Sequence, residues 1–286
     1  MTWEQILHIL IHTLEDTARL IPFLLVAYLL IEWLEHKAGD GFERFLKRSG
    51  KFGSAVGGLL GMVPQCGFSV VCANFYAGRI VTTGTVVAVM LATSDEALPI
   101  MLASNAPLEQ IFALLGAKLV IGVVTGFLVD ALYKRKEQQP GQELCQNCGC
   151  EHDHGFVKSV LLPALRHVGI ITAFLFAITL VLNGVIEAVG EDNIASFLGG
   201  SSLLQPIVAA LFGFIPNCAA SVVITQLYIA GGLSFGSAVA GLCTGAGAGM
   251  LVLVKANRNM KENLFIAAVM FVAASVSGVL LQLFVG

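Results

Sequence analysis

The sequence predicts an all-α polytopic membrane protein made of two inverted-topology repeats of five segments each, with proline-broken hairpins that meet near the midplane of the bilayer. Three observations predict this class. Of 286 residues, 56% are hydrophobic and only 12% are charged, whereas soluble domains carry about 25% charged residues. Apolar runs have the length that crosses a bilayer. Two of these runs contain a Pro-amide-Cys sequence, and the two copies lie 152 residues apart.

Charge and cysteine content exclude several classes of protein. The net charge of −3 provides no broad basic surface for nucleic acid. Seven cysteines, four of them inside apolar stretches, do not form a secreted disulfide framework. The N-terminal residues lack the basic start of a signal peptide, so we expect the whole chain to be mature protein. The expected partners are the lipid bilayer and a metal-ion substrate, and a homo-oligomer is left open.

The expected membrane segments are of two kinds. Two apolar regions, 52–77 and 204–230, have a proline in the middle, Pro64 in the first and Pro216 in the second. Proline removes a backbone donor and disfavours helix in the preceding residue, so each region is expected to form two half-helices joined at a tip. Six uninterrupted runs are near the roughly 20 residues that span a bilayer, at 17–34, 81–104, 108–132, 160–186, 234–254 and 263–285.

Basic residues set the expected orientation. They cluster between residues 37 and 51, at 134–136, and between residues 255 and 261. Loops rich in lysine and arginine remain in the cytoplasm. We therefore expect a protein of the inner (plasma) membrane with both termini outside and the linker 134–157 in the cytoplasm.

An internal repeat relates the two halves. A shift of 152 positions makes ten of the 28 positions from 61 to 88 identical, and Pro64 and Cys66 are among them. This defines a first repeat at 1–133, the linker 134–157, and a second repeat at 158–286. Because each repeat has an odd number of segments, the second is expected to be inverted. Inverted repeats with interrupted helices are typical of secondary transporters, whose substrate site lies at the midplane.

Each proline-broken tip carries an amide, a thiol and a hydroxyl. Unwound backbone leaves carbonyl oxygens available to a cation beside these side chains. Cysteine also packs well at helix crossings, which is the alternative role of the thiols. The substrate-binding positions expected at the two tips are Gln65, Cys66, Ser69, Asn217, Cys218 and Ser221.

Two acidic residues, Asp95 and Glu96, lie in the middle of the apolar run 81–104. A charge inside hydrocarbon is costly and usually marks a functional site. Pro99 should clash with the carbonyl group of Asp95 and open the helix there. Two carboxylates beside amide oxygens and thiols favour a divalent first-row metal, with oxygen favouring manganese and sulfur favouring zinc. The matching run of the second half has no acid but has glycines at 241, 245, 247 and 249, which should loosen that helix.

Lys118 lies in the middle of the run 108–132, and its repeat counterpart is Met270. One hypothesis is that Lys118 pairs with Asp95 or Glu96 when no cation is bound. Binding of the cation would then be coupled to release of the lysine or of a proton. A constant salt bridge is the alternative.

The linker contains three cysteines and two histidines within ten residues. A C-x-x-C pattern in a reducing compartment binds metal more often than it forms a disulfide. The linker is therefore expected to capture or sense zinc-like ions, or to be an incidental chelating segment. No other cofactor is expected. The proposed ligands are Cys145, Cys148, Cys150, His152 and His154.

The tips Val-Pro-Gln-Cys-Gly-Phe-Ser and Ile-Pro-Asn-Cys-Ala-Ala-Ser occur together with Ala-Thr-Ser-Asp-Glu-Ala-Leu-Pro, Thr-Gly-Ala-Gly and the Cys/His-rich linker. This combination resembles the family of 10TM heavy-metal exporters over essentially the whole chain. Members of that family are labelled manganese transporters or arsenic efflux proteins. The resemblance implies a heavy-metal carrier, and the matching site positions are Gln65, Cys66, Asp95, Glu96, Asn217 and Cys218.

The expected function is therefore that of a carrier, not an enzyme. It would export a divalent transition metal, manganese or similar, by alternating access and with proton coupling. One alternative is efflux of arsenite or an organoarsenical bound by Cys66 and Cys218. The other is a membrane metal sensor or thiol-redox protein that works through residues 145–154.

Overall fold

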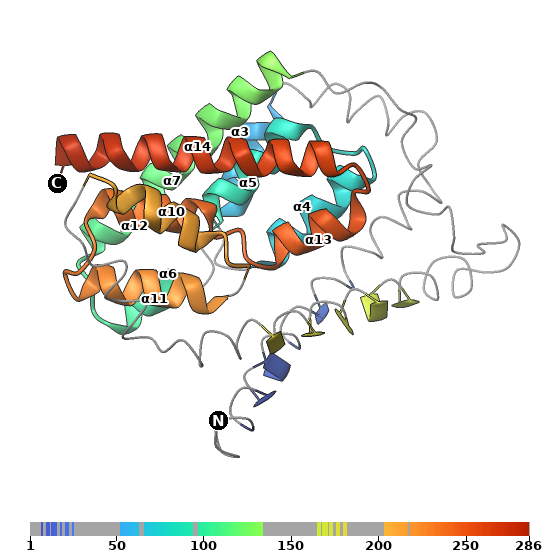
Figure 1. The fold of residues 1–286 in the computed structure, drawn as a ribbon, viewed down its shortest axis with the longest axis horizontal. Coiled ribbons are helices and arrows are strands. Elements are labelled where there is room, and N and C mark those ends of the chain that lie inside the picture. Colours follow the sequence, from blue (N-terminus) through green and yellow to red (C-terminus); the bar gives the residue numbers. More distant parts are fainter. Residues whose placement is uncertain are drawn as a thin grey trace, which may run out of the picture.

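The computed structural model describes residues 52–62, 66–93, 97–133, 203–216 and 218–285, with scattered positions between 7 and 25 and between 165 and 181. This part of the chain is helical and contains no strand (Figure 1), which confirms the predicted all-α class. In chain order, the helices are α3 Gly53–Gly61, α4 Cys66–Ala77, α5 Thr83–Ala92, α6 Ala97–Ala103, α7 Leu108–Leu132, α10 Gln205–Gly213, α11 Cys218–Ile229, α12 Phe235–Thr244, α13 Ala248–Ala256 and α14 Met260–Val285.

Four segments of the described chain are long and apolar enough to cross a membrane. They are Thr83–Ala103, Leu108–Leu132, Phe235–Ala256 and Met260–Phe284. Each agrees within three residues at either end with a run predicted from the sequence. The other two predicted spans are described only at scattered positions, which are helical: between residues 18 and 25 for the span 17–34, and between residues 165 and 181 for the span 160–186.

The two proline-containing regions each form a pair of short helices, as predicted. The first pair is α3 and α4, and the second is α10 and α11, with nine and twelve residues in each pair. Each helix is shorter than the roughly 20 residues that cross a bilayer. Pro216 lies just before α11, whereas Pro64 lies outside the described residues.

Helix bounds in the second half repeat those of the first half 152 residues later. α3, α4, α5 and α7 begin at residues 53, 66, 83 and 108, and α10, α11, α12 and α14 begin at 205, 218, 235 and 260. The packing partners correspond as well. α5 packs against α3 and α7, and α12 packs against α10 and α14.

Glycines allow α5 and α7 to approach closely. A Cβ atom added to Gly84 would lie 2.1 Å from the carbonyl oxygen of Gly126. The contact recurs between α12 and α14, where a Cβ atom on Gly236 would lie 2.2 Å from the carbonyl oxygen of Gly278. Small residues at helix crossings permit such approach of backbones. A side chain at any of these positions would push the two helices apart.

Asp130, in the last turn of α7, binds the N-terminal end of α5. Its carboxylate accepts hydrogen bonds from Ser54 Oγ at 2.9 Å, Thr82 Oγ1 at 2.8 Å and the backbone N–H of Gly84 at 2.8 Å. A helix N-terminus carries positive partial charge, so a carboxylate there is stabilising. In the second half, the side-chain oxygen of Gln205 accepts hydrogen bonds at the start of α12.

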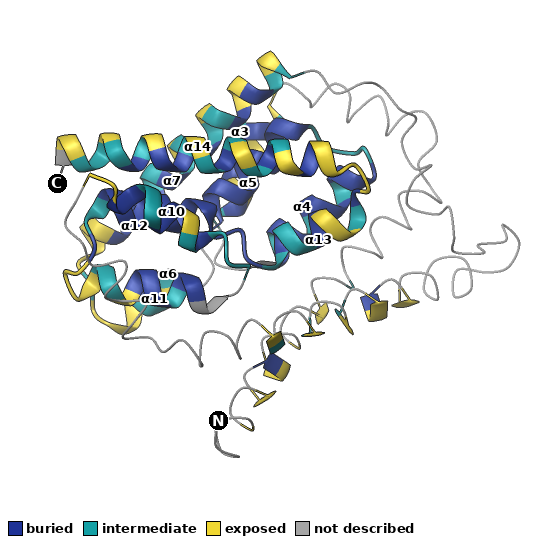
Figure 2. Ribbon diagram, viewed as in Figure 1, coloured by how far each residue is buried: buried dark blue, intermediate teal, exposed yellow. Residues whose placement is uncertain are grey.

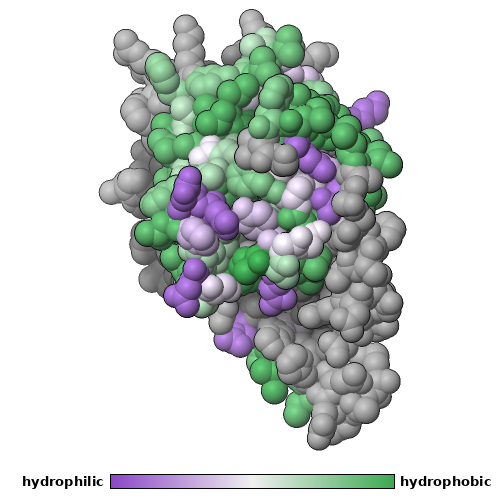
Figure 3. All heavy atoms as spheres, turned by 90° about the vertical axis from the view of Figure 1, so that its left-hand side faces the viewer, coloured by the Kyte–Doolittle hydropathy of each residue, from purple (hydrophilic) through white to green (hydrophobic). Residues whose placement is uncertain are grey.

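The two halves also exchange helix contacts. α4 packs against α13, and α11 packs against α6 (Figure 1). The buried residues face these contacts, whereas the outer sides of α7 and α14 carry many exposed apolar side chains (Figure 2). Figure 3 shows the face with the C-terminal end of α14, where polar side chains gather near the middle and apolar ones lie above them and along the left edge. This distribution suits a protein surrounded by lipid.

Replacing Gly126 by alanine should destabilise the fold, because the added methyl group would meet the carbonyl oxygen of Gly84 and the side chain of Ala88. Overpacking of this kind costs about 1–3 kcal/mol. The matched control on α7 is Gly116, which has no atom within 4 Å of an added Cβ. Gly116→Ala should instead stabilise the helix by about 0.5–1 kcal/mol. Thermal unfolding in detergent compares the two variants, and equal melting temperatures would contradict the close contact.

Candidate functional site

The third span of each half is interrupted near its middle. α5 ends at Ala92, and Thr93 continues in an extended conformation with ψ of 129°. α12 and α13 are separated by residues 245–247, of which Gly247 has a φ of 50° that favours glycine. The first interruption precedes Pro99, as predicted. The second occurs within the group of glycines that was expected to loosen the helix.

Lys118 connects the two interruptions. Its side chain extends from the middle of α7 and is fully buried. The ammonium group donates a hydrogen bond to the carbonyl oxygen of Thr93 and another, of 2.7 Å, to the carbonyl oxygen of Leu242. One lysine thus contacts the C-terminal ends of α5 and α12, which belong to different halves of the chain.

These helix ends are electrostatically suited to a cation. The last carbonyl groups of a helix have no intrahelical partner and carry the negative end of the helix dipole. Away from bulk water, such a charge is screened weakly and acts strongly on a nearby ion. The point where α5 and α12 end is therefore a place where positive charge is stabilised by backbone groups of both halves.

Ser69 and Ser221, one from each proline-broken tip, lie on either side of the second interruption. Both are buried. Ser69 Oγ donates a 3.3 Å hydrogen bond to the carbonyl oxygen of Ala246. Ser69 also lies close to Gly249, because a Cβ atom added to Gly249 would be 2.6 Å from Ser69 Oγ. Ser221 lies close to Gly245 in the same way, with 3.2 Å between Ser221 Oγ and an added Cβ atom. The first turns of α4 and α11 thus reach the same glycine-rich segment.

The structure therefore brings together Ser69, Ser221 and Lys118 of the predicted site around residues 242–249. Cys66 and Cys218 are the first residues of α4 and α11, but their side chains lie outside the described part of the chain, as do Gln65, Asp95, Glu96 and Asn217. Their roles remain predictions.

The linker ligands are likewise untested. Cys145, Cys148, Cys150, His152 and His154 all lie outside the described residues. Within the described ranges, histidine, cysteine, aspartate and glutamate do not form a group of three or more able to hold a metal ion.

Two polar features of the structure have no counterpart among the residues predicted for the site. One is the backbone of Thr93 and Leu242 as the partner of Lys118, which no side-chain pattern encodes. The other is a buried carboxylate, Glu262, that bonds to Tyr76 and Arg79. A signal for the second existed, because Glu262 is an acid in the first turn of a long apolar helix.

Comparison with known proteins identifies one family. The model of the family described as "Putative, 10TM heavy-metal exporter" matches residues 5–165 and 157–285, which together are nearly the whole chain. No curated protein matches the chain, and no solved structure matches it.

Lys118→Met should lower the thermal stability of the protein. The variant removes the donor that Thr93 and Leu242 share, and loss of one partner from a buried hydrogen bond costs about 1–3 kcal/mol. Methionine occupies the equivalent buried position of α14, Met270, so a methionine at position 118 copies the residue of the other half. Met270→Leu conserves volume and should cost less than about 1.5 kcal/mol. A melting temperature unaffected by Lys118→Met would show that the bridge contributes nothing to the fold.

Proposed function

Because the chain belongs to the family of 10TM heavy-metal exporters, we propose that it exports a divalent transition-metal ion, manganese or a similar heavy metal, from the cytoplasm in exchange for protons. The family is one of membrane transporters and not of enzymes. The observation that carries the proposal is the contact of Lys118 with both interrupted spans. Two half-helices ending at one buried cation suit a carrier that binds positively charged cargo.

In this proposal the two halves have opposite orientations in the membrane. The supporting contacts lie at one end of α7. There, Asp130 bonds to the first turn of α5, and Tyr133 stacks on Phe265 of α14 with ring centroids 4.6 Å apart. The C-terminal end of α7 thus adjoins the N-terminal end of its counterpart α14. Counterpart helices that meet end to start in this way are expected of an inverted repeat.

The proposed cargo site is completed by Asp95 and Glu96. They follow Thr93, the described partner of Lys118, by two and three residues, and we propose on this ground that their carboxylates share the site with the Lys118 ammonium. In the proposed site, these carboxylates and the side-chain amides of Gln65 and Asn217 supply oxygen ligands to the metal ion. Oxygen ligands around a divalent ion favour manganese, and adjacent thiolates would extend the range to softer metals.

Lys118 is the proposed coupling residue. Without metal, its ammonium occupies the place where the carbonyl groups and the nearby carboxylates attract positive charge. A divalent ion at the same place repels the ammonium, so the metal and the charged lysine exclude each other. Movement of the lysine, or loss of its proton, would then accompany metal binding. This competition is the basis of the proposed exchange for protons.

The orientation proposed for the membrane follows the basic residues. Lys255, Arg258 and Lys261 flank the connection from α13 to α14, and positively charged connections stay inside. This places the C-terminal end of α7 and the linker 134–157 in the cytoplasm, with both termini outside the plasma membrane.

Efflux of arsenite or an organoarsenical is the second candidate. Its support is that Cys66 and Cys218 begin the two helices whose serines, Ser69 and Ser221, meet at residues 245–249. Two thiols near one point would suit a soft, thiol-binding cargo.

Asp95→Asn should reduce manganese export from loaded cells by roughly tenfold or more, since loss of a carboxylate ligand worth 1.4 kcal/mol already has that effect. Glu109→Gln is the matched control, because Glu109 is an exposed acid in the first turn of α7 and should leave export unchanged. Export would be measured as cellular manganese content over time. Full activity of Asp95→Asn would contradict a cation cargo.

The double variant Cys66→Ser, Cys218→Ser separates the two cargoes. It should retain manganese export while abolishing any resistance to arsenite, because only the soft cargo needs thiolates. Cellular manganese and arsenic would be measured in the same cultures. Arsenic efflux that survives the double variant would exclude the thiol-bound cargo.

Deletion of residues 144–155 tests the linker. A carrier whose site lies between the helices should keep at least part of its export activity, whereas a sensor that works through the Cys/His segment should lose all of it. The comparison requires equal amounts of the two proteins in the membrane. Complete loss of export at equal abundance would favour the sensor over the carrier.

A further inference from the structure

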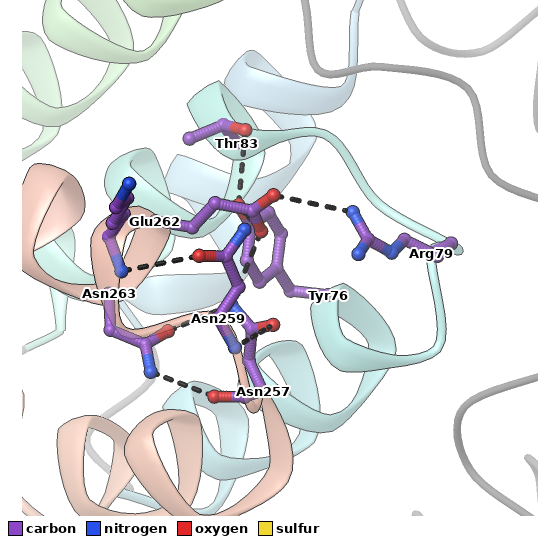
Figure 4. A network of polar contacts seen from close by, with 8 residues as sticks. Tyr76, Arg79, Thr83, Asn257, Asn259, Glu262 and Asn263 are labelled. Atoms are coloured by element: carbon purple, nitrogen blue, oxygen red, sulfur yellow. Dashed lines mark hydrogen bonds and ion pairs between the residues drawn. The ribbon is translucent and has the colours of Figure 1, made fainter.

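A second polar cluster lies away from the Lys118 site, at the N-terminal end of α14. Figure 4 shows the residues around the Glu262 carboxylate. Glu262 Oε2 accepts hydrogen bonds from Tyr76 Oη at 3.2 Å and Asn257 Nδ2 at 3.3 Å. Glu262 Oε1 lies 3.6 Å from Arg79 Nη1. Asn263 extends the cluster through a 2.8 Å hydrogen bond from Asn257 Nδ2 to its Oδ1. We call these five residues the Glu262 cluster.

The Glu262 cluster joins the two halves of the chain. Tyr76 lies in α4 and Arg79 just after it, both in the first half. Glu262 and Asn263 lie in the first turn of α14, and Asn257 directly follows α13, in the second half. α4 also packs along α13. The cluster therefore fastens α4 to the α13–α14 connection, at the end that carries the basic residues.

Arg79 keeps an unfavourable backbone conformation in this cluster. Its φ is 63°, in the left-handed region that residues other than glycine seldom adopt. The residue at the equivalent position of the second half is Gly231, with φ of 78°. Glycine is thus sufficient for the turn, whereas the arginine adds strain, and its ion pair with Glu262 is one contact that offsets this strain. Strain persists where the surrounding contacts hold it and is frequent at switch regions, which makes this turn a candidate for one.

The opposite end of the molecule lacks these charges. The positions equivalent to Arg79, Glu262 and Asn263 are Gly231, Gln110 and Ile111, which cannot form an ion pair. The equivalent tyrosines of the two ends also differ in burial. Tyr76 is fully buried, while its counterpart Tyr228 is partly exposed. The two ends are thus fastened by different interactions, although the helices themselves correspond.

We propose that the Glu262 cluster is the latch that closes the cytoplasmic side of the carrier. With the latch formed, α4 stays against α13 and the Lys118 site is shut off from the cytoplasm. When the ion pair and the Tyr76 hydrogen bond break, α4 separates from the α13–α14 connection and cargo can reach the site. The inference rests on the proposed alternating access and adds to it the residues that control one of the two gates.

The test measures from which side the central site can be reached. A cysteine at position 69, in a protein whose native cysteines are replaced by serine, reports access to the site next to Ala246. A membrane-impermeant thiol reagent is added to inside-out or right-side-out vesicles, and the labelling rate is measured. The test variants are Arg79→Gly and Glu262→Gln. Arg79→Gly installs the residue of the other half and suits the backbone, so it should fold. Gln110→Ala, at the counterpart of Glu262, is the control.

Both test variants should raise the labelling rate from the cytoplasmic face by about fivefold or more, which is the effect of a modest shift from the closed to the open state. The labelling rate from the other face should stay the same or fall. Gln110→Ala should not raise the cytoplasmic rate. Unchanged rates in both test variants, or an equal rise from the two faces, would overturn the latch. Manganese flux is measured in parallel, in vesicles of the same composition that contain the wild-type protein. Normal flux with no effect of the variants on labelling refutes the latch alone, whereas absence of flux refutes the proposed function.

Discussion

The buried ammonium group of Lys118 lies between the carbonyl oxygens of Thr93 and Leu242 and so connects the interrupted spans of the two halves. Neither a charge nor an unpaired carbonyl group is stable inside an apolar environment. The lysine and the interrupted helices stabilise each other, because the ends of α5 and α12 offer carbonyl oxygens to the Lys118 ammonium and the ammonium gives these carbonyl groups a donor. The same arrangement places backbone carbonyl groups of both halves around one point, which is where the proposed function puts a positively charged cargo in competition with the lysine.

The packing of the helices explains why this place lies between the halves. Close contacts at Gly84 and Gly126, and again at Gly236 and Gly278, hold the interrupted spans against the long helices α7 and α14. α4 and α11 then lie against the far segments of the other half, α13 and α6. Each half is thus a similar unit, and the central site exists only when both are present. The polar contacts at the two ends differ, however, which gives the molecule two unlike sides.

Much of this fold could be predicted from the sequence, because backbone effects of proline and glycine are local. Pro99 and the glycines from 241 to 249 predict the two interruptions of the helices. Hydropathy predicts the first and last residues of the four spans to within three positions. The partners of polar side chains were harder. Lys118 was expected near Asp95 and Glu96, but its described partners are backbone carbonyl groups, which are the same in every residue. The ion pair of Arg79 and Glu262 joins residues far apart in the chain, so no spacing rule could connect them.

In the proposed inverted arrangement, equivalent segments of the two halves face opposite sides of the membrane, and their interrupted spans end at one buried site. The most direct measurement is the sidedness of two single cysteines in intact membranes, one at exposed Ser104 between α6 and α7, and one at exposed Arg258 in the equivalent connection between α13 and α14. We predict that an impermeant thiol reagent labels position 104 only from outside the cell and position 258 only from the cytoplasm. Labelling of both positions from the same side would exclude an inverted arrangement of the two halves.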